Sequence, residues 1–226
     1  VYVSSTEAPN NIAKHNPDAK IIIMLRNPVD FVNSLHQHLV GIATEDEPDL
    51  LQALAKEPAR RAGRELAKRT RCPSDLFYRQ RAEYSTQIKR YQAAFPDKQI
   101  LILTAEEFRA DNAAVYKQVL AFLGADTNWR PAEFGRVNES RAPRFKALHR
   151  VMNSLIIKRA INRLFGPQGY EKIKRGVAKV ILKQQSVAKL DAATRQELKR
   201  SFQPEVEATA KLLKRPDLLK LWDYQA

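Results

Sequence analysis

A chain of 226 residues with 44% hydrophobic and 28% charged residues has ordinary globular composition, which excludes a disordered chain and leaves room for one substantial core. We therefore expect residues 1–226 to form a single domain. The formal net charge of +14 calls for a negatively charged partner, such as a nucleotide, an acidic glycan, an anionic lipid or a nucleic acid.

Three short apolar runs predict strands of a parallel sheet. They cover residues 1–5, 20–25 and 99–103, and each is rich in aliphatic residues and bounded by polar or turn residues. Helical patterns separate them, and continuous apolar strands alternating with helices are typical of a parallel sheet covered on both faces. The predicted fold class is α/β, a parallel sheet flanked by helices with a largely helical C-terminal half.

The helical patterns lie between the strands and after the third one. Ser74 can cap a long helix that carries an apolar stripe over residues 77–95, before Pro96-Asp97 ends it. Residues 111–123 predict an amphipathic helix that Gly124 closes. The pattern is almost wholly helical from residue 148 onward. Its last long helix carries the apolar residues Leu198, Phe202 and Val206, and Pro216 starts a short terminal piece with Leu218, Leu221 and Trp222.

One stretch combines a strand, a turn and a helix with residues suited to binding phosphate. The buried strand 20–25 ends in Arg26, Asn27-Pro28 makes a turn, and a helix begins near Pro28 with Asp30 in its first turn. Open α/β sheets bind ligands at the carboxyl ends of their strands, where Arg26 stands. Ser34 follows two turns along the helix. An arginine fork and a hydroxyl on adjoining elements are good phosphate donors.

The sequence Arg-Asn-Pro-Val-Asp at residues 26–30, followed by Ser34, resembles the 3′-phosphate-binding motif of the PAPS-dependent sulfotransferase superfamily. The resemblance implies that Arg26 and Ser34 bind the 3′-phosphate of the donor, 3′-phosphoadenosine 5′-phosphosulfate (PAPS), on a P-loop-like sheet. Phe31 replaces the basic residue that is usual after the acidic position. Other stretches resemble bacterial and heparan-type members in the same order: residues 16–20, 76–91, 95–108, 122–124 and 198–222.

The resemblance also indicates a second basic site, at residues 137–144. In relatives, a basic loop near this point folds over the nucleotide, so Arg141 and Arg144 are candidates for further contacts with the 3′-phosphate. A solvated loop is the alternative. Heparan-type enzymes frame this loop with a pair of cysteines, and this chain has one cysteine in all, Cys72.

Family members begin with a loop that binds the 5′-phosphosulfate through backbone N–H groups and a lysine. Residues 1–25 contain no glycine, so we expect residues 1–226 to lack this loop. Thr6-Glu7 also runs directly into Ala8-Pro9, where relatives insert an acceptor-facing segment. Glu7 is the nearest carboxylate to that place and is the candidate catalytic base, with an ordinary surface role as the alternative.

Other classes of function remain open at this point. The charge is also consistent with a helical nucleic-acid-binding protein, although no recognised motif with interleaved aromatics supports one. A phosphotransferase would want an acidic magnesium ligand where Arg26 stands, and a non-catalytic nucleotide-binding module is a third alternative. We expect an enzyme whose acceptor is a hydroxyl or amine of a glycan or a lipid head group, with carbohydrate favoured and nucleic acid not expected.

Histidine and cysteine usage predicts no metal site and a reducing compartment. His36 and His38 point in different directions from a helix, and a packing or surface role is favoured for His36 over one near the acceptor. A single cysteine allows no disulfide within the chain, and the apolar run of residues 21–25 is too short to span a bilayer. We therefore expect a cytoplasmic, bacterial protein without a transmembrane segment.

Overall fold

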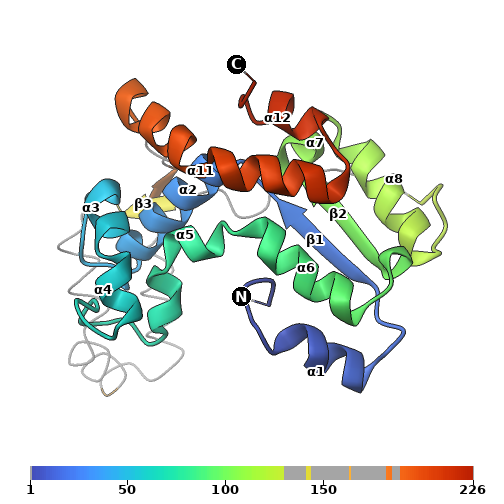
Figure 1. The fold of residues 1–226 in the computed structure, drawn as a ribbon, viewed down its shortest axis with the longest axis horizontal. Coiled ribbons are helices and arrows are strands. Elements are labelled where there is room, and N and C mark those ends of the chain that lie inside the picture. Colours follow the sequence, from blue (N-terminus) through green and yellow to red (C-terminus); the bar gives the residue numbers. More distant parts are fainter. Residues whose placement is uncertain (1, 130–140, 144–162, 164–181, 185–188, 226) are drawn as a thin grey trace.

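The structure is a computed structural model that describes residues 2–129, 141–143, 163, 182–184 and 189–225. Figure 1 shows its elements along the chain. The helices before the second strand are α1 (Ala8–His15), α2 (Pro28–Gly41), α3 (Leu50–Ala55), α4 (Glu57–Arg61), η1 (Pro73–Leu76), α5 (Tyr78–Arg81), α6 (Tyr84–Ala94) and η2 (Asp97–Gln99). The later helices are α7 (Ala105–Ala110), α8 (Asn112–Leu123), α11 (Ala192–Leu213) and α12 (Asp217–Leu221). The strands are β1 (Ile21–Leu25), β2 (Ile100–Thr104), β3 (Arg141–Pro143) and β4 (Leu182–Gln184).

Strands β1 and β2 form a parallel pair, as the arrows in Figure 1 show. Their register runs from Ile21 opposite Ile100 to Leu25 opposite Thr104. The chain between them supplies the helical crossover that parallel neighbours require. Two of the three predicted strands and the α/β class are therefore confirmed. Both strands end at the same edge, so the residues that follow them are neighbours.

The third predicted strand, at residues 1–5, is wrong for its described part. The backbone turns here, with the N–H of Ser5 bonded to the carbonyl of Tyr2 at 3.1 Å. The Ser5 hydroxyl then accepts the N–H groups of Glu7 and Ala8 at 3.2 and 3.1 Å, which starts α1. A serine hydroxyl that binds the backbone N–H groups two and three residues further on favours a turn over the extended conformation.

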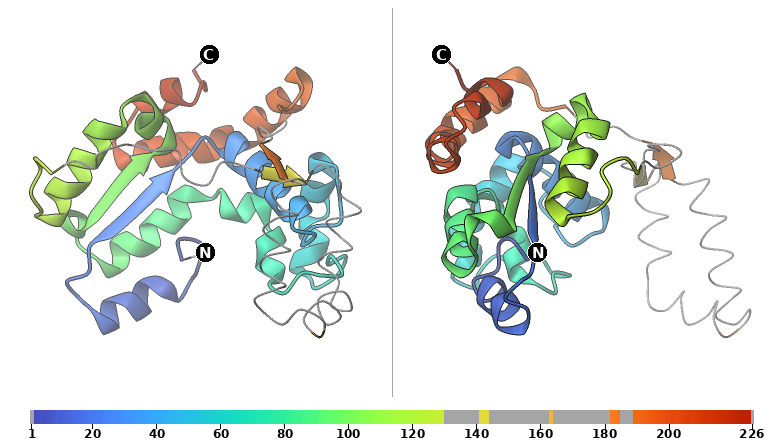
Figure 2. Two further views of the ribbon diagram at one scale, coloured as in Figure 1. Left: turned by 180° about the vertical axis from the view of Figure 1, so that it is seen from behind. Right: turned by 90° about the vertical axis from the view of Figure 1, so that its right-hand side faces the viewer.

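The two faces of β1 differ in burial, contrary to the expectation of a strand buried on both sides. Ile23 and Leu25 are 5% and 2% exposed, whereas Ile22 and Met24 are 41% and 49% exposed. Helix α8 packs against β2 on the face that Met24 shares with Leu103, and leaves the β1 part of that face open. Figure 2 shows the sheet edge-on, with α6 on one side and α8 on the other.

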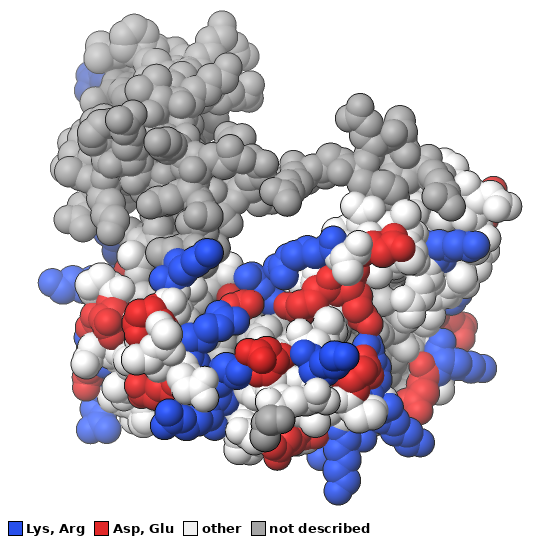
Figure 3. All heavy atoms as spheres, turned by 90° about the horizontal axis from the view of Figure 1, so that it is seen from above, with Lys and Arg blue, Asp and Glu red and all other residues white. Residues whose placement is uncertain are grey.

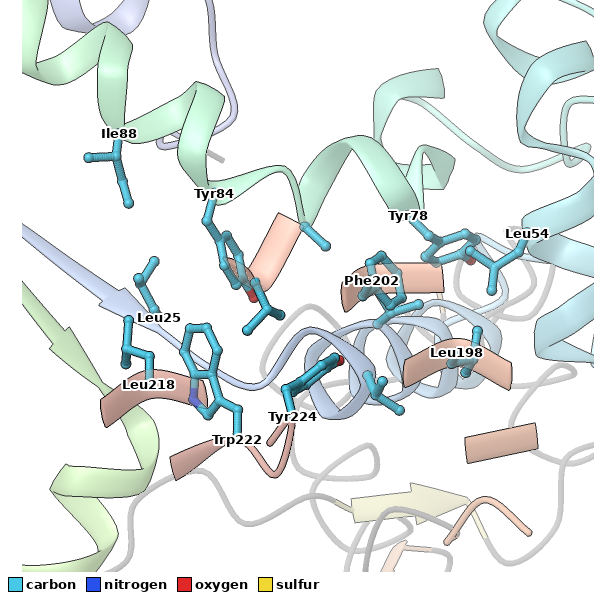
Figure 4. Packing of buried hydrophobic residues seen from close by; sticks show 14 of the residues in the cluster. Leu25, Leu54, Tyr78, Tyr84, Ile88, Leu198, Phe202, Leu218, Trp222 and Tyr224 are labelled. Carbon is cyan, nitrogen blue, oxygen red and sulfur yellow. The ribbon is translucent and has the colours of Figure 1, made fainter. Parts of the chain in front are cut away.

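The main core lies on the opposite face of the sheet, among β1, α2, α6, α11 and α12. Figure 4 shows Tyr84 of α6 beside Leu25 and Trp222. The predicted stripe on the last long helix is confirmed, and so is the short terminal helix after Pro216. Leu218 and Trp222, at this terminal helix, are fully buried and pack in the same core as the end of β1. Leu221 is exposed.

The single long helix predicted from Ser74 to residue 95 is instead three short helices, η1, α5 and α6. The chain leaves helical geometry at Phe77 and at Glu83, where ψ is 72° and 66°. Carboxylates from distant helices bind the N–H groups exposed at both breaks. Glu57 accepts from Arg79 and Gln80 at 2.8 and 3.2 Å, and Glu205 accepts from Ser85 at 2.6 Å. These tertiary caps replace the helical turns that the sequence pattern predicts.

Two further predictions concern the chain after β2. Helix α8 ends at Gly124, whose φ of 75° lies in the left-handed region, so the predicted glycine cap is confirmed. The helical pattern from residue 148 lies largely outside the described residues. Within the described part of that region, β4 pairs antiparallel with β3, so a short strand occurs where helix was expected. Helix α11 bears out the helical prediction near the C-terminus.

Candidate functional site

Arg26 stands directly after β1, at the carboxyl edge of the sheet, as predicted. The hydroxyl of Tyr84 donates to its backbone carbonyl at 2.9 Å. Tyr84 is buried against Trp222, with 6.2 Å between ring centroids, and burial raises the pKa of its phenol. The phenol therefore keeps its proton and holds the backbone at Arg26 in place.

The turn after Arg26 is fixed by the side chain and backbone of Asn27. Its side-chain oxygen accepts the N–H of Val29 at 3.0 Å, which caps α2. Its amide nitrogen donates to the carbonyl of Trp222 at 2.8 Å, and its backbone N–H donates to Glu106 at 3.3 Å. Asn27 is buried, and three elements hold it. The direction in which the chain leaves β1 is therefore set by contacts from α7 and α12.

The guanidinium of Arg26 has no counter-ion among the described residues. Its Nε is buried and makes no hydrogen bond there. Burial lowers the pKa of Arg26, and the positive charge of Arg109 lowers it further. The nearby carboxylate of Asp30 is bound to Arg195 at 2.8 Å. A partly buried cation with an unused donor, at the edge where α/β sheets bind ligands, is suited to an anion from solution.

Ser34 lies on α2, one turn after Asp30, so the two residues share a side of the helix. The charge of Asp30 acts on Arg26, which places Arg26 near that same side. Ser34 is half-buried, and its hydroxyl makes no hydrogen bond within the described part of the chain. The hydroxyl is free to bind a ligand, and its shared role with Arg26 stays a prediction.

Sequence reasoning missed Glu106 and Arg109, which follow β2 on α7. The Glu106 carboxylate accepts the indole N–H of Trp222 at 2.9 Å and lies 3.7 Å from the guanidinium of Arg109. A signal for this helix start was present, because Thr104 and Glu107 form a capping box directly after the strand. That pattern marks where α7 begins. It does not show that α7 meets the turn after β1.

The remaining candidates are not brought to this site by any contact in the described residues. Glu7 is exposed at the start of α1, and its carboxylate accepts only the hydroxyl of Thr6, at 3.2 Å. Arg141 belongs to β3, opposite Gln184, and Arg144 lies outside the described residues. The roles of all three stay predictions.

His36 has the packing role that the sequence favoured. It is buried on α2, with Nε2 at 2.9 Å from the carbonyl of Glu47 and its ring edge-on to Tyr78. Within the described part of the chain, no group of three His, Cys, Asp or Glu side chains is arranged to hold a metal ion. No described helix is both long and apolar enough to cross a membrane.

Comparison with known proteins agrees with this arrangement. The family model described as a sulfotransferase domain matches residues 8–202. The chain belongs to the sulfotransferase domain family. The crystal structure of a sulfotransferase from Alicyclobacillus acidocaldarius superposes with a TM-score of 0.64 at 25% sequence identity, over 98% of this chain and 64% of that one.

Curated relatives of this sulfotransferase domain include bifunctional heparan sulfate N-deacetylase/N-sulfotransferases. Enzyme 3 of Homo sapiens is 31% identical over 137 residues, which are 58% of this chain and 14% of that protein. Enzyme 1 of Xenopus laevis is 34% identical over 123 residues, 54% of this chain and 13% of that protein. The matched residues are thus a small part of each of these relatives.

Proposed function

We propose that this sulfotransferase domain transfers a sulfuryl group from PAPS to a hydroxyl or amine of a carbohydrate. The assignment of PAPS as the sulfuryl donor rests on the guanidinium of Arg26 at the carboxyl edge of the sheet. Its Nε is a buried hydrogen-bond donor without a partner, and the group has no counter-ion among the described residues. The free hydroxyl of Ser34 on the adjoining helix supplies a second donor for the 3′-phosphate of PAPS.

The reaction makes one bond to sulfur and breaks another. The acceptor oxygen or nitrogen attacks sulfur, the bond between sulfur and the bridging oxygen breaks, and its electron pair leaves with 3′-phosphoadenosine 5′-phosphate. The acceptor proton passes to a base, for which Glu7 is the candidate in this chain. Holding the donor in line and stabilising the charge on the departing phosphate supply the catalysis. Arg26 and Ser34 bind the donor and do not touch sulfur.

Adenosine 3′,5′-bisphosphate is expected to raise the melting temperature of the protein far more than adenosine 5′-phosphate at equal concentration. The two nucleotides differ by the phosphate that Arg26 and Ser34 would bind, and a ligand that binds only the folded state stabilises it by RT ln(1 + L/Kd), where L is the free ligand concentration. A thermal shift titration with both nucleotides measures the difference. Equal shifts at every concentration would contradict the donor assignment.

The acceptor proposal rests on a basic loop at residues 62–72, between α4 and η1. Its four cations are exposed, and none forms an ion pair with a carboxylate among the described residues: Arg64, Lys68, Arg69 and Arg71. Glu65 is the only acidic residue in this loop. Unpaired cations of this density suit a chain of repeated anionic groups, such as an acidic glycan. Heparan sulfate, in the names of the relatives, is a polymer of that kind.

The backbone of the basic loop is held in one conformation, which keeps its cations on a defined surface. The N–H of Arg64 bonds to the carbonyl of Ala59 at 2.9 Å, after Gly63 with a φ of 74°. The fully buried Arg60 donates from Nε to the carbonyl of Glu65 at 3.3 Å, and Ala67 is buried. An ordered loop loses little conformational entropy when it binds a ligand.

Changing all four cations of the basic loop to glutamine is expected to weaken heparin binding about 30- to 100-fold at physiological salt, from about 0.5–0.7 kcal/mol for each exposed contact. The control replaces four exposed lysines elsewhere by glutamine, with the same change in net charge: Lys89, Lys98, Lys117 and Lys211. Calorimetry on both variants measures the effect. Equal losses for the two would show non-specific attraction to a protein of pI about 10.0 and contradict the proposed acceptor surface.

A nucleic acid is the competing polyanion for the basic loop, and the heparin titration is repeated with single-stranded and duplex DNA. Figure 3 shows acidic side chains interspersed with Lys and Arg over the described part of one face, so that face carries no uniform positive field of the kind that tracks a phosphate backbone. The glycan proposal requires tighter binding of heparin than of either DNA. The reverse order would favour a nucleic-acid-binding protein.

A further inference from the structure

Arg109 approaches the donor site across the carboxyl edge of the sheet. The two strands end in register, Leu25 opposite Thr104, so the turn after β1 and the helix after β2 are neighbours. One carboxylate oxygen of Glu106 joins them, because it lies 3.3 Å from the backbone nitrogen of Asn27 and 3.7 Å from Nη1 of Arg109. The guanidinium of Arg109 is therefore placed beside the residue that directly follows Arg26.

The negative charge at this edge does not balance the positive charge. Glu106 also accepts the indole N–H of Trp222, so one carboxylate serves two hydrogen bonds and holds Arg109 only at 3.7 Å. Asp30 is bound to Arg195. The pKa of Arg26 is lowered by burial and then by the positive charge of Arg109, and the negative charges of Asp30 and Glu106, which raise it, do not offset these two causes. Two arginines that repel each other would both gain from an anion placed between them.

Building on the proposed function, we propose that Arg109 is a second binding residue for the 3′-phosphate of the donor, which lies between the guanidinium groups of Arg26 and Arg109. A phosphate monoester carries nearly two negative charges and three acceptor oxygens, enough to bind two guanidinium forks at once. The side chain of Arg109 is 55% exposed, so it can turn toward a ligand without breaking a buried contact. Glu106 acts as a positioning residue that holds Arg109 at the edge of this site.

Arg109→Gln tests the proposal through binding constants for adenosine 3′,5′-bisphosphate and adenosine 5′-phosphate, measured by calorimetry on the full chain. We expect bisphosphate binding to weaken about 5- to 30-fold, as for a charge-assisted contact at an exposed site, and monophosphate binding to stay unchanged. Arg109→Lys should recover part of the loss. Lys98→Gln, an equal charge change at an exposed residue outside both proposed binding sites, should leave both constants unaltered.

The outcomes separate this inference from the proposed function. Normal bisphosphate binding by Arg109→Gln, with a loss in Arg26→Ala, overturns the role of Arg109 and leaves the donor assignment standing. Equal weakening of both nucleotides by Arg109→Gln overturns the assignment to the 3′-phosphate. If the unaltered protein does not distinguish the two nucleotides, the donor assignment fails, and the inference fails with it.

Discussion

Replacing Arg60 by methionine is expected to lower the free energy of unfolding by about 3–5 kcal/mol. The Arg60 side chain is fully buried and binds both oxygens of Glu45, at 2.7 and 2.8 Å. The Tyr78 hydroxyl donates to the same carboxylate at 2.8 Å. Methionine fills part of the space and leaves Glu45 as a buried carboxylate without its cation. Urea denaturation at pH 7 measures the loss.

The neighbouring Arg61 is the matched control, because its side chain is 44% exposed and its buried partner Glu57 keeps the backbone N–H groups of Arg79 and Gln80 when Arg61 is removed. Arg61→Met should cost at most about 1 kcal/mol. Equal losses for Arg60→Met and Arg61→Met would contradict the importance of the buried pair.

The contribution of Glu45 to the free energy of unfolding should change with pH in opposite directions in the unaltered protein and in Arg60→Met. Burial alone would raise the pKa of Glu45, but hydrogen bonds from Arg60, the backbone of Glu47 and Tyr78 outweigh it and lower the pKa. That contribution to stability is present above the unfolded pKa, about 4.3, and is lost as pH falls through the folded pKa. Without Arg60, burial raises the folded pKa, so the variant loses stability as pH rises through it. The deficit should therefore shrink toward pH 4.

The parts of the fold that follow from local pattern were predictable from the sequence. Strands β1 and β2 are short aliphatic runs between polar residues, and Gly124 ends α8 because it can adopt a left-handed backbone. The prediction of one long helix from Ser74 to residue 95 failed because Glu57 and Glu205, far away in the sequence, accept the N–H groups at the two points where the chain leaves helical geometry. Local periodicity contains no information about such partners.

The same distinction applies to the candidate site. Arg26 and Ser34 belong to one strand, turn and helix, so their relation can be read from consecutive residues. Arg109 comes near Arg26 only because β2 pairs with β1 in register, and pairing of distant strands is not visible in either segment alone. Asn27 likewise depends on Trp222, almost at the end of the chain. The C-terminal helix thus supports the turn that presents Arg26, although the sequence pattern shows only an apolar helix there.

Replacing Arg26 by alanine is expected to weaken adenosine 3′,5′-bisphosphate binding about 10- to more than 100-fold, because a charge-assisted hydrogen bond is worth about 1.5–3 kcal/mol. The fold should remain intact. The Arg26 guanidinium makes no hydrogen bond or ion pair among the described residues, and the contact from Tyr84 uses the backbone carbonyl, which alanine keeps. Calorimetry gives the binding constant, and thermal denaturation without ligand checks the fold.

Ser34→Ala should cost less than Arg26→Ala, about 2- to 13-fold, because it removes a neutral donor worth about 0.5–1.5 kcal/mol. The order of the two losses in nucleotide affinity tests the assigned roles more sharply than the size of either loss, since only the arginine supplies charge. A larger loss from Ser34→Ala than from Arg26→Ala would mean that the hydroxyl, and not the guanidinium, holds the phosphate. A loss of heparin affinity at constant nucleotide affinity would place both residues on the acceptor side of the site instead.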